Sequence, residues 1–227
     1  MLRVAVCLIW LAGTAAADVV SAGYTGPTTR YDHGVLGDAV EWGALEMRTS
    51  DGRLVTVTLP ETRVFEDTAP RLSDLDGDGA AEVIAVETDL RLGARLSIYD
   101  ESGLVAATEF IGQTHRWLAP AGAADLDGDG RVELAYVDRP HLVRRLRFWR
   151  LDGDRLVEIA GLDGVTNHRI GDPEISGGVR ACGGTPELVL LSADWSRIVA
   201  VTLPGPRMRD AGANAPGALD RFLACEN

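Results

Sequence analysis

The chain has 227 residues and a formal net charge of −12, and 46% of its residues are hydrophobic. This acidic balance argues against binding to nucleic acid or to anionic membrane surfaces, because both attract basic proteins. The length and the apolar fraction suit one domain with a single core, which we expect to span residues 18–227.

Residues 1–17 have the pattern of a secretory signal peptide. Arg3 supplies the positive charge, Val4 to Ala12 form the apolar stretch, and Ala15-Ala16-Ala17 offers a small-residue cleavage site. The apolar stretch is too short to span a membrane, so we expect no membrane span in the mature chain. The sequence therefore predicts an exported protein, periplasmic or secreted, that is cleaved near Ala17.

The rest of the chain has the sequence pattern of an all-β protein. Short segments of alternating or apolar residues predict strands at 53–59, 95–99, 104–108, 145–151, 155–159 and 197–203. Turn signals such as Asp51-Gly52 and Asp152-Gly153 separate these segments. Helical periodicity is limited to residues 216–225, where Pro216 favours the first turn of one short helix.

Two segments, 74–82 and 125–133, share the pattern Asp-Leu-Asp-Gly-Asp-Gly-x-x-Glu. Carboxylates this close together repel one another unless a cation neutralises them. Calcium binds about six to eight oxygen ligands, which alternate side chains and one backbone carbonyl can supply. We therefore predict two Ca²⁺ sites. Their ligands are Asp74, Asp76, Asp78, Ala80 (through its carbonyl) and Glu82, and Asp125, Asp127, Asp129, Arg131 (through its carbonyl) and Glu133.

Two other interpretations of these loops are an EF-hand and a simple Asp-Gly turn. An EF-hand needs a glutamate at position 12 of the loop and a helix on either side, but that position holds Ala85 in the first loop and Tyr136 in the second. A simple Asp-Gly turn is the other alternative, although a turn needs one aspartate rather than three and a glutamate.

Because each loop leads into a short apolar strand, the two segments resemble the calcium loops of FG-GAP (VCBS-type) repeats. Such repeats form the blades of integrin-alpha-like β-propellers, and the resemblance implies that each loop joins the first and second strands of a blade. The Phe-Gly and Gly-Ala-Pro hallmarks are absent from this chain. Alignment on the glutamate that closes each loop adds two degenerate, or worn, copies of the motif, which end at Glu41 and Glu187.

About four such repeats fit the mature chain, so we expect a small all-β propeller of about four blades. The alternative is an open, incomplete propeller, which would leave strand edges bare. Bare edges pair readily with another chain, so the open form makes a homo-oligomer possible.

Two cysteines remain after the expected cleavage, Cys182 and Cys225, and an oxidising compartment favours their pairing. Cys182 lies in the worn copy before Glu187, where the three aspartates are absent. We therefore expect the bridge to hold the C-terminal segment where the other repeats hold an ion.

No sequence signature supports catalysis, since nucleophile elbows, phosphate-binding loops and zinc-binding histidine pairs are all missing. His115 and His168 hold nearly equivalent repeat positions, which favours a structural role at blade junctions over an acid–base or metal pair.

The sequence thus favours an exported calcium-binding β-propeller that acts as a non-catalytic binding or scaffold module, with a protein or glycan as partner. A purely structural repeat that binds only calcium is a further alternative. A third is an exported hydrolase or lyase acting on polysaccharide or phosphoester, with its site on the propeller axis. An enzyme would bring ionisable groups together in one pocket.

Overall fold

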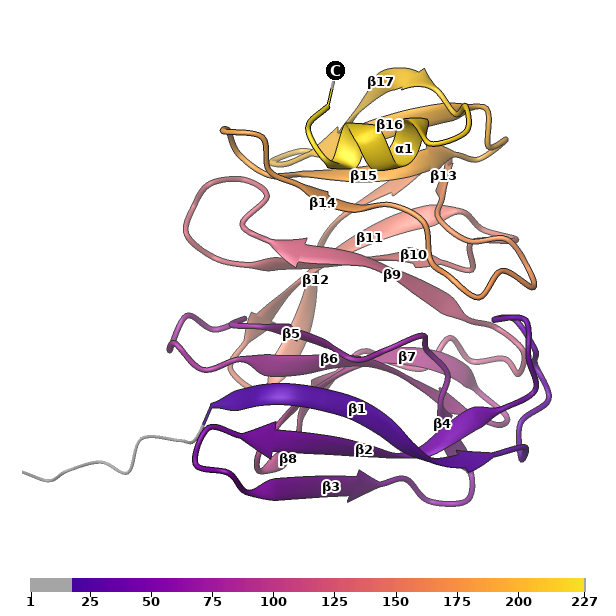
Figure 1. Ribbon diagram of the computed structural model, residues 1–227, viewed down its shortest axis with the longest axis vertical. Coiled ribbons are helices and arrows are strands. Elements are labelled where there is room, and N and C mark those ends of the chain that lie inside the picture. The colour runs from indigo at the N-terminus through magenta and orange to yellow at the C-terminus, as the bar shows by residue number, and fades with distance from the viewer. Residues whose placement is uncertain (1–17, 227) are drawn as a thin grey trace, which may run out of the picture.

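The structure is a computed structural model that describes residues 18–226, so the expected signal peptide lies outside the described residues. The described chain consists of antiparallel β-sheets and one short helix, which confirms the all-β class. Three sheets lie one above another along the longest axis of the molecule (Figure 1). Within residues 18–226, no helix has the length and apolar character needed to cross a membrane.

The first sheet has eight strands in the order β1-β2-β4-β6-β7-β8, with β3 paired to β2 and β5 paired to β6. Their bounds are β1 Val19–Thr28, β2 Glu41–Thr49, β3 Leu54–Thr58, β4 Arg63–Phe65, β5 Arg71–Ser73, β6 Glu82–Asp89, β7 Gly93–Asp100 and β8 Gly103–Ala107.

The second sheet has the order β12-β11-β10-β9, and the third has the order β13-β15-β16-β17 with β14 paired to β15. Helix α1 covers the outer face of the third sheet (Figure 1), where its apolar residues pack against β15 and β16. The bounds are β9 Leu118–Ala124, β10 Glu133–Asp138, β11 Arg145–Asp152, β12 Arg155–Asp163, β13 Val165–Thr166, β14 Gly178–Arg180, β15 Glu187–Ser192, β16 Arg197–Thr202, β17 Arg207–Ala213 and α1 Ala218–Leu223.

Each of the four aligned glutamates is the first residue of a central strand. Glu41 begins β2, Glu82 begins β6, Glu133 begins β10 and Glu187 begins β15. All four are buried, with at most 9% of each residue exposed. Each repeat predicted from a glutamate therefore corresponds to one central strand of the structure.

The predicted closed wheel of about four blades is not seen in residues 18–226, which form three sheets and no closed ring. The physical reason is β4, which pairs with β2 through Trp42 and Phe65 and with β6 along its whole length. This short strand joins the first two repeats into one sheet.

One contact does link the first repeat to the last. In the β1–β2 loop, the carbonyl of Val35 accepts a hydrogen bond of 2.9 Å from Gly171 N–H, which lies beyond β13. A Cβ atom on Gly37 would lie 2.6 Å from the carbonyl oxygen of Gly171, so only glycine permits this approach. The loop therefore extends along the stack from the first sheet to the third.

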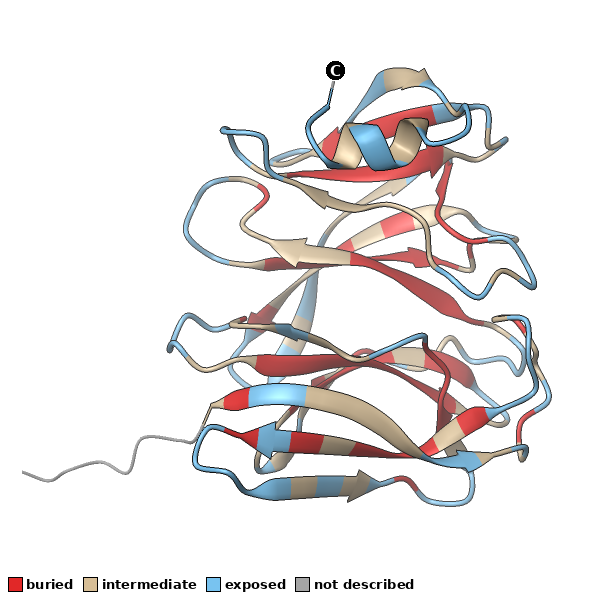
Figure 2. Cartoon of the chain, viewed as in Figure 1, coloured by how far each residue is buried: buried red, intermediate tan, exposed pale blue. Residues whose placement is uncertain are grey.

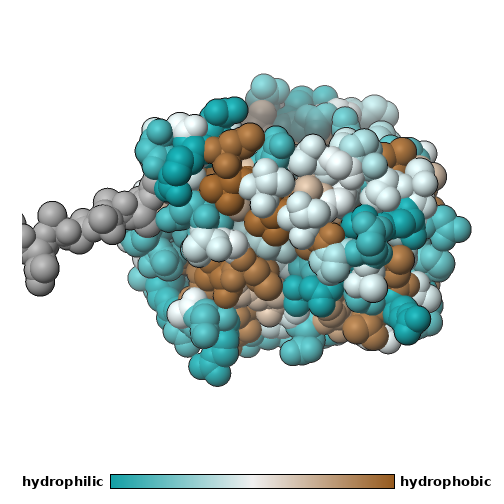
Figure 3. All heavy atoms as spheres, turned by 90° about the horizontal axis from the view of Figure 1, so that it is seen from below, coloured by the Kyte–Doolittle hydropathy of each residue, from teal (hydrophilic) through white to brown (hydrophobic). Residues whose placement is uncertain are grey.

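The central strands are almost completely buried, whereas the outer strands β3 and β12 are largely exposed (Figure 2). β6, β10 and β15 each have an apolar centre because both faces of the strand are covered, by a neighbouring sheet, by another part of the same sheet or, for β15, by α1. Large side chains fill the space between the first two sheets, and a second cluster fills the space between the second and third. Viewed from the β3 end, apolar groups on the surface are separated by polar ones (Figure 3).

Candidate functional site

The loop between β5 and β6 wraps around the carboxylate of Asp74. Its Oδ1 accepts a hydrogen bond of 2.7 Å from Gly77 N–H, and its Oδ2 accepts one of 3.0 Å from Gly79 N–H. Both glycines have positive φ angles, 81° and 92°, which residues with a side chain adopt at a cost. The Asp-x-x-Gly-x-Gly spacing thus fixes the turn of the loop.

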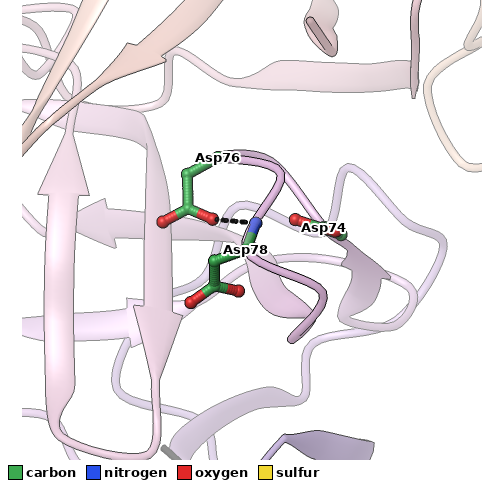
Figure 4. A group of neighbouring side chains, drawn as sticks. All are labelled: Asp74, Asp76 and Asp78. Carbon is green, nitrogen blue, oxygen red and sulfur yellow. Dashed lines mark hydrogen bonds between the residues drawn. The ribbon is translucent and has the colours of Figure 1, made fainter. Parts of the chain in front are cut away.

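The next two aspartates continue this pattern. Asp76 Oδ1 accepts a hydrogen bond of 3.0 Å from Asp78 N–H, and Asp78 Oδ1 accepts one of 2.8 Å from Ala80 N–H. Oxygens of Asp74, Asp76 and Asp78 lie within 4.8 Å of one another, on one exposed loop (Figure 4). Each carboxylate oxygen has two lone pairs, so these hydrogen bonds leave acceptor capacity for a cation.

Glu82 closes the loop from the first position of β6. Its Oε2 accepts a hydrogen bond of 2.7 Å from the N–H of the buried Leu75, which joins the two ends of the loop. Burial, together with the charges of the three neighbouring aspartates, raises the pKa of Glu82 to about 7. The ionised form of Glu82 is therefore disfavoured unless a cation compensates for it.

The loop between β9 and β10 repeats this geometry. Asp125 accepts hydrogen bonds from Gly128 N–H at 2.7 Å and Gly130 N–H at 3.0 Å. Glu133 accepts one of 2.7 Å from Leu126 N–H, as Glu82 does from Leu75. The aspartates at the third and fifth positions also match, with hydrogen bonds from Asp129 N–H to Asp127 at 3.1 Å and from Arg131 N–H to Asp129 at 2.9 Å.

The family model of the FG-GAP-like repeat matches residues 74–136, a segment that contains both loops and the strands between them. Residues 74–136 are an FG-GAP-like repeat region. Ala80 and Arg131 occupy the same place in its two loops, and the use of their carbonyls as ligands stays a prediction.

The fold resembles two solved lyases at low identity. Rhamnogalacturonan lyase YesW is 16% identical, with a TM-score of 0.48 over 89% of this chain and 46% of that chain. The exotype rhamnogalacturonan lyase YesX is 17% identical, with a TM-score of 0.48 over 88% of this chain and 44% of that chain. This chain spans less than half the length of either lyase. No curated protein matches it.

The two loops of the FG-GAP-like region differ in one residue that lies outside them. Arg150, on β11, places Nη2 2.9 Å from Asp127 and 2.8 Å from Asp129, and its Nε is 2.5 Å from Glu133. The strand register that aligns Glu133 with Arg150 aligns Glu82 with Asp100 on β7. The second loop therefore has a guanidinium cation, while the corresponding position beside the first loop holds another acid.

The worn copy in the third sheet has replaced its aspartates entirely. Glu187 still begins β15, where it forms ion pairs with Arg180 at 2.8 Å and with Arg209 at 2.9 Å. The predicted disulfide between Cys182 and Cys225 is present, with 5.8 Å between the two Cα atoms. Two guanidinium groups and a covalent link thus stand where the FG-GAP-like region has its acidic loops.

Asp18 is a participant that sequence reasoning missed. Its carboxylate accepts a hydrogen bond of 2.7 Å from Ala81 N–H, inside the first acidic loop. Because 63 residues separate this pair along the chain, no local pattern could have identified it.

The four histidines of the chain lie close together along one side of the stack of sheets, although each comes from a different loop. His33 Nδ1 lies 2.5 Å from Oε1 of the buried Glu66, and the rings of His33 and His115 stack with their centroids 5.2 Å apart. His141 Nε2 lies 3.0 Å from His168 Nδ1. Sequence reasoning matched His115 with His168 but had no means of bringing His33 and His141 beside them.

Trp117 connects the two halves of this histidine cluster. Its ring packs against both His141 and His168, with centroids 6.4 Å and 4.9 Å away, and its Nε1–H donates a 2.8 Å hydrogen bond to the Glu66 carbonyl. The cluster is thus one connected arrangement of ionisable groups, and it is separate from the acidic loops.

Proposed function

We propose that this protein is an exported calcium-binding module with a non-catalytic binding or scaffold role, built as an open arc of FG-GAP-like blades. The observation that carries the proposal is the shared hydrogen-bond pattern of the loops 74–82 and 125–133. Two loops that arrange the same carboxylates in the same way, at the same point of consecutive repeats, are built for one chemical purpose.

The donor set of these loops suits calcium. All the predicted ligands are oxygens, which hard cations prefer to the nitrogen and sulfur ligands of zinc or copper. A bound ion would relieve the repulsion that raises the pKa of Glu82, and it would also fix β5 to β6. Because an unfolded chain does not assemble the site, ion binding adds to folding stability.

The disulfide and the N-terminal sequence support the export part of the proposal. A Cys182–Cys225 bridge persists in oxidising compartments and is rare in reducing ones. Calcium sites of modest affinity also suit calcium-rich surroundings outside the cytosol.

A cleft of about 440 Å³ beside β10–β12 supports a binding role with a glycan as the preferred partner. Its walls include Phe110, Tyr136 and Trp149, together with charged side chains of both signs. Aromatic faces with a few polar groups are typical of small-molecule sites of roughly this volume. The indole Nε1 of Trp149 is buried without a hydrogen-bond partner in the described structure, so a ligand acceptor would satisfy it.

The test is affinity electrophoresis of the mature protein in gels containing neutral or acidic polysaccharides, with calcium and with a chelator. We expect one polysaccharide to retard the protein in calcium, and we expect Trp149→Ala to abolish the retardation. Trp195→Ala is the matched control, because Trp195 lies outside the cleft and packs against Arg169. If no polysaccharide retards the protein, the glycan part of the proposal fails.

The histidine cluster favours a second candidate, an exported hydrolase or lyase acting on polysaccharide or phosphoester. His33 with Glu66 forms a pair suited to proton transfer, and His115 and Tyr31 lie beside it. Release of reducing ends from polysaccharides, or of phosphate from a phosphoester, would support this candidate if His33→Gln abolished it. An equal rate in the His33→Gln variant would exclude the cluster as the active site.

A further inference from the structure

A small hollow of about 30 Å³ lies among the histidines and is lined by His33, His115, Arg116, Trp117, Arg139, His141 and Leu142. Five of these seven side chains are basic and none is acidic, in a chain whose net charge is −12. We propose that this hollow binds an oxyanion, namely the carboxylate, phosphate or sulfate group of a ligand. The inference deepens the proposed binding role, on which it rests, by naming the chemistry of the ligand.

The acids closest to the hollow are already engaged. Glu66 is bound by His33 and by the hydroxyl of Thr88 at 2.7 Å. Asp138 is bound by Arg139 at 2.7 Å and by Arg147 at 3.1 Å. The remaining acid, Asp32, is exposed and lies 3.6 Å from His115. An anion entering the hollow would therefore meet hydrogen-bond donors with little opposing negative charge.

The donors themselves have free capacity. Glu66 occupies Nδ1 of His33, which leaves Nε2 on the opposite edge of the ring, where it is a hydrogen-bond donor when the imidazole is protonated. A guanidinium has five N–H donors. The described structure engages one nitrogen of Arg116, whose Nη1 donates a 2.9 Å hydrogen bond to the His115 carbonyl. Hydrogen bonds from such charged groups to an oxyanion are among the strongest that proteins make.

The backbone holds two of the lining residues in an uncommon conformation. His115 has a φ of 54° and Arg139 a φ of 46°, both in the left-handed region that disfavours residues with side chains. His115 N–H donates a 2.8 Å hydrogen bond to the Tyr31 hydroxyl, and Arg139 N–H donates one of 3.0 Å to the Trp117 carbonyl. Costly backbone geometry of this kind occurs where the position of a side chain matters.

Electrostatics agree with this geometry. Burial, together with the positive charges of His168, His33 and Arg144, lowers the pKa of His141 to about 4. A protonated imidazole at His141 would therefore need a negative charge beside it. An oxyanion in the hollow would supply that charge. At about 30 Å³ the hollow is too small for a whole sugar, so a ligand would place only its charged group there.

The experiment follows the ring protons of the four histidines by NMR in the mature protein with excess calcium. The probes are inorganic phosphate, inorganic sulfate and glucuronate, with glucose as the neutral control. We expect saturable shifts of the His33, His115 and His141 signals with the anions and none with glucose. Because Arg139 also lines the larger cleft, an additional shift of the Trp149 indole signal with glucuronate alone would identify an acidic sugar rather than a free inorganic anion.

Arg116→Gln should weaken anion binding about tenfold, the loss expected for one charge-assisted hydrogen bond. Arg53→Gln is the control, since Arg53 is an exposed arginine that pairs with Asp51 and lines neither the hollow nor the larger cleft, and this variant should bind phosphate like the parent. If Arg116→Gln does not fold, Arg139→Gln replaces it, because Asp138 keeps Arg147 as a partner.

Absence of a saturable shift with every anion overturns the proposal, and so does unchanged affinity in the folded arginine variant. The calcium role is tested separately by melting with a chelator. If calcium raises the melting temperature but no anion shifts the histidine signals, the proposed anion site is wrong and the proposed calcium role is unaffected.

Discussion

Arg150 reaches into the second acidic loop, where its Nε lies 2.5 Å from Oε1 of Glu133. Glu133 is completely buried, so this guanidinium neutralises a charge that would otherwise be costly. The first loop has Asp100 at the corresponding place and no such partner. Two loops with one sequence motif therefore differ in how far the chain itself compensates their negative charge.

Removal of calcium should lower the melting temperature of the mature protein, and added calcium should restore it. A ligand at one hundred times its dissociation constant stabilises the folded state by about 2.7 kcal/mol per site, which corresponds to a shift of roughly 5–10 °C for a domain of this size. Differential scanning calorimetry with a chelator, and then with calcium or magnesium, measures the effect. A melting curve that ignores the chelator would contradict the metal assignment.

The first loop should account for most of this response. We expect Asp76→Asn to remove more than half of the stabilisation by calcium and Asp127→Asn to remove less, because Arg150 already binds Asp127 at 2.9 Å. The double variant should show no response. Calcium titration of the melting temperature checks the order, and complete loss in either single variant would refute the two-site assignment.

Arg150→Leu should make the second loop more dependent on calcium. Without the guanidinium, the buried Glu133 loses its partner, and breaking a buried pair costs about 3–5 kcal/mol. The variant should melt lower than the parent in chelator and recover most of the difference in calcium. Arg145→Leu is the control on the same strand, since its partner Asp163 is exposed and such pairs contribute about 0–1 kcal/mol. If the two variants had equal melting temperatures in chelator and in calcium, this would argue against Arg150 as the cation that compensates the charge of the second loop.

Glu41→Gln should stabilise the protein at neutral and alkaline pH. Burial, together with the negative charges of the nearby Glu66, Asp38 and Asp67, raises the pKa of Glu41 to about 9. The folded state therefore holds a proton that the unfolded state releases near pH 4.5, and stability falls as the pH rises from about 4.5 to 9. Urea unfolding should show no benefit of the variant below this window and a benefit of about 1–3 kcal/mol above it. A benefit that does not change with pH would contradict this account.

Loss of the disulfide should destabilise the third sheet. The bridge closes a segment with a sequence separation of 43, for which the chain-entropy relation gives roughly 4 kcal/mol as an upper value. Cys182→Ser should lower stability by up to this amount, and mass spectrometry of the unreduced parent should find no free thiol. A free thiol in the unreduced parent would show that the bridge does not form.

The parts of the fold that depend on local chemistry could be predicted from the sequence. Alternating patterns located β3, β11 and β16, and the Asp-x-Asp-x-Asp-Gly spacing located both loops between the first and second strands of their repeats. Pro216 correctly preceded the only helix of the described residues, α1. These features follow from side-chain period and turn geometry, which a few neighbouring residues determine.

The parts that depend on long-range pairing could not be predicted. β4 has three residues and no alternation, yet it merges two repeats into one sheet by pairing on both edges. Arg150 lies 17 residues after Glu133, and the two side chains meet only through the register of β10 with β11. The histidines meet because four separate loops end at the same place in the stack, and no spacing in the sequence encodes that.

The covalent link at Cys225 has a consequence for how the molecule comes apart. It links α1 covalently to the β14–β15 turn, so the outermost hairpin cannot separate from the other sheets. The opposite end of the described chain has no such covalent link and is held by apolar packing and by hydrogen bonds such as the one from Ala81 N–H to Asp18. Under fluctuating calcium, fraying and proteolytic nicking would therefore begin around the first acidic loop, while the last blade persists as a protease-resistant remnant.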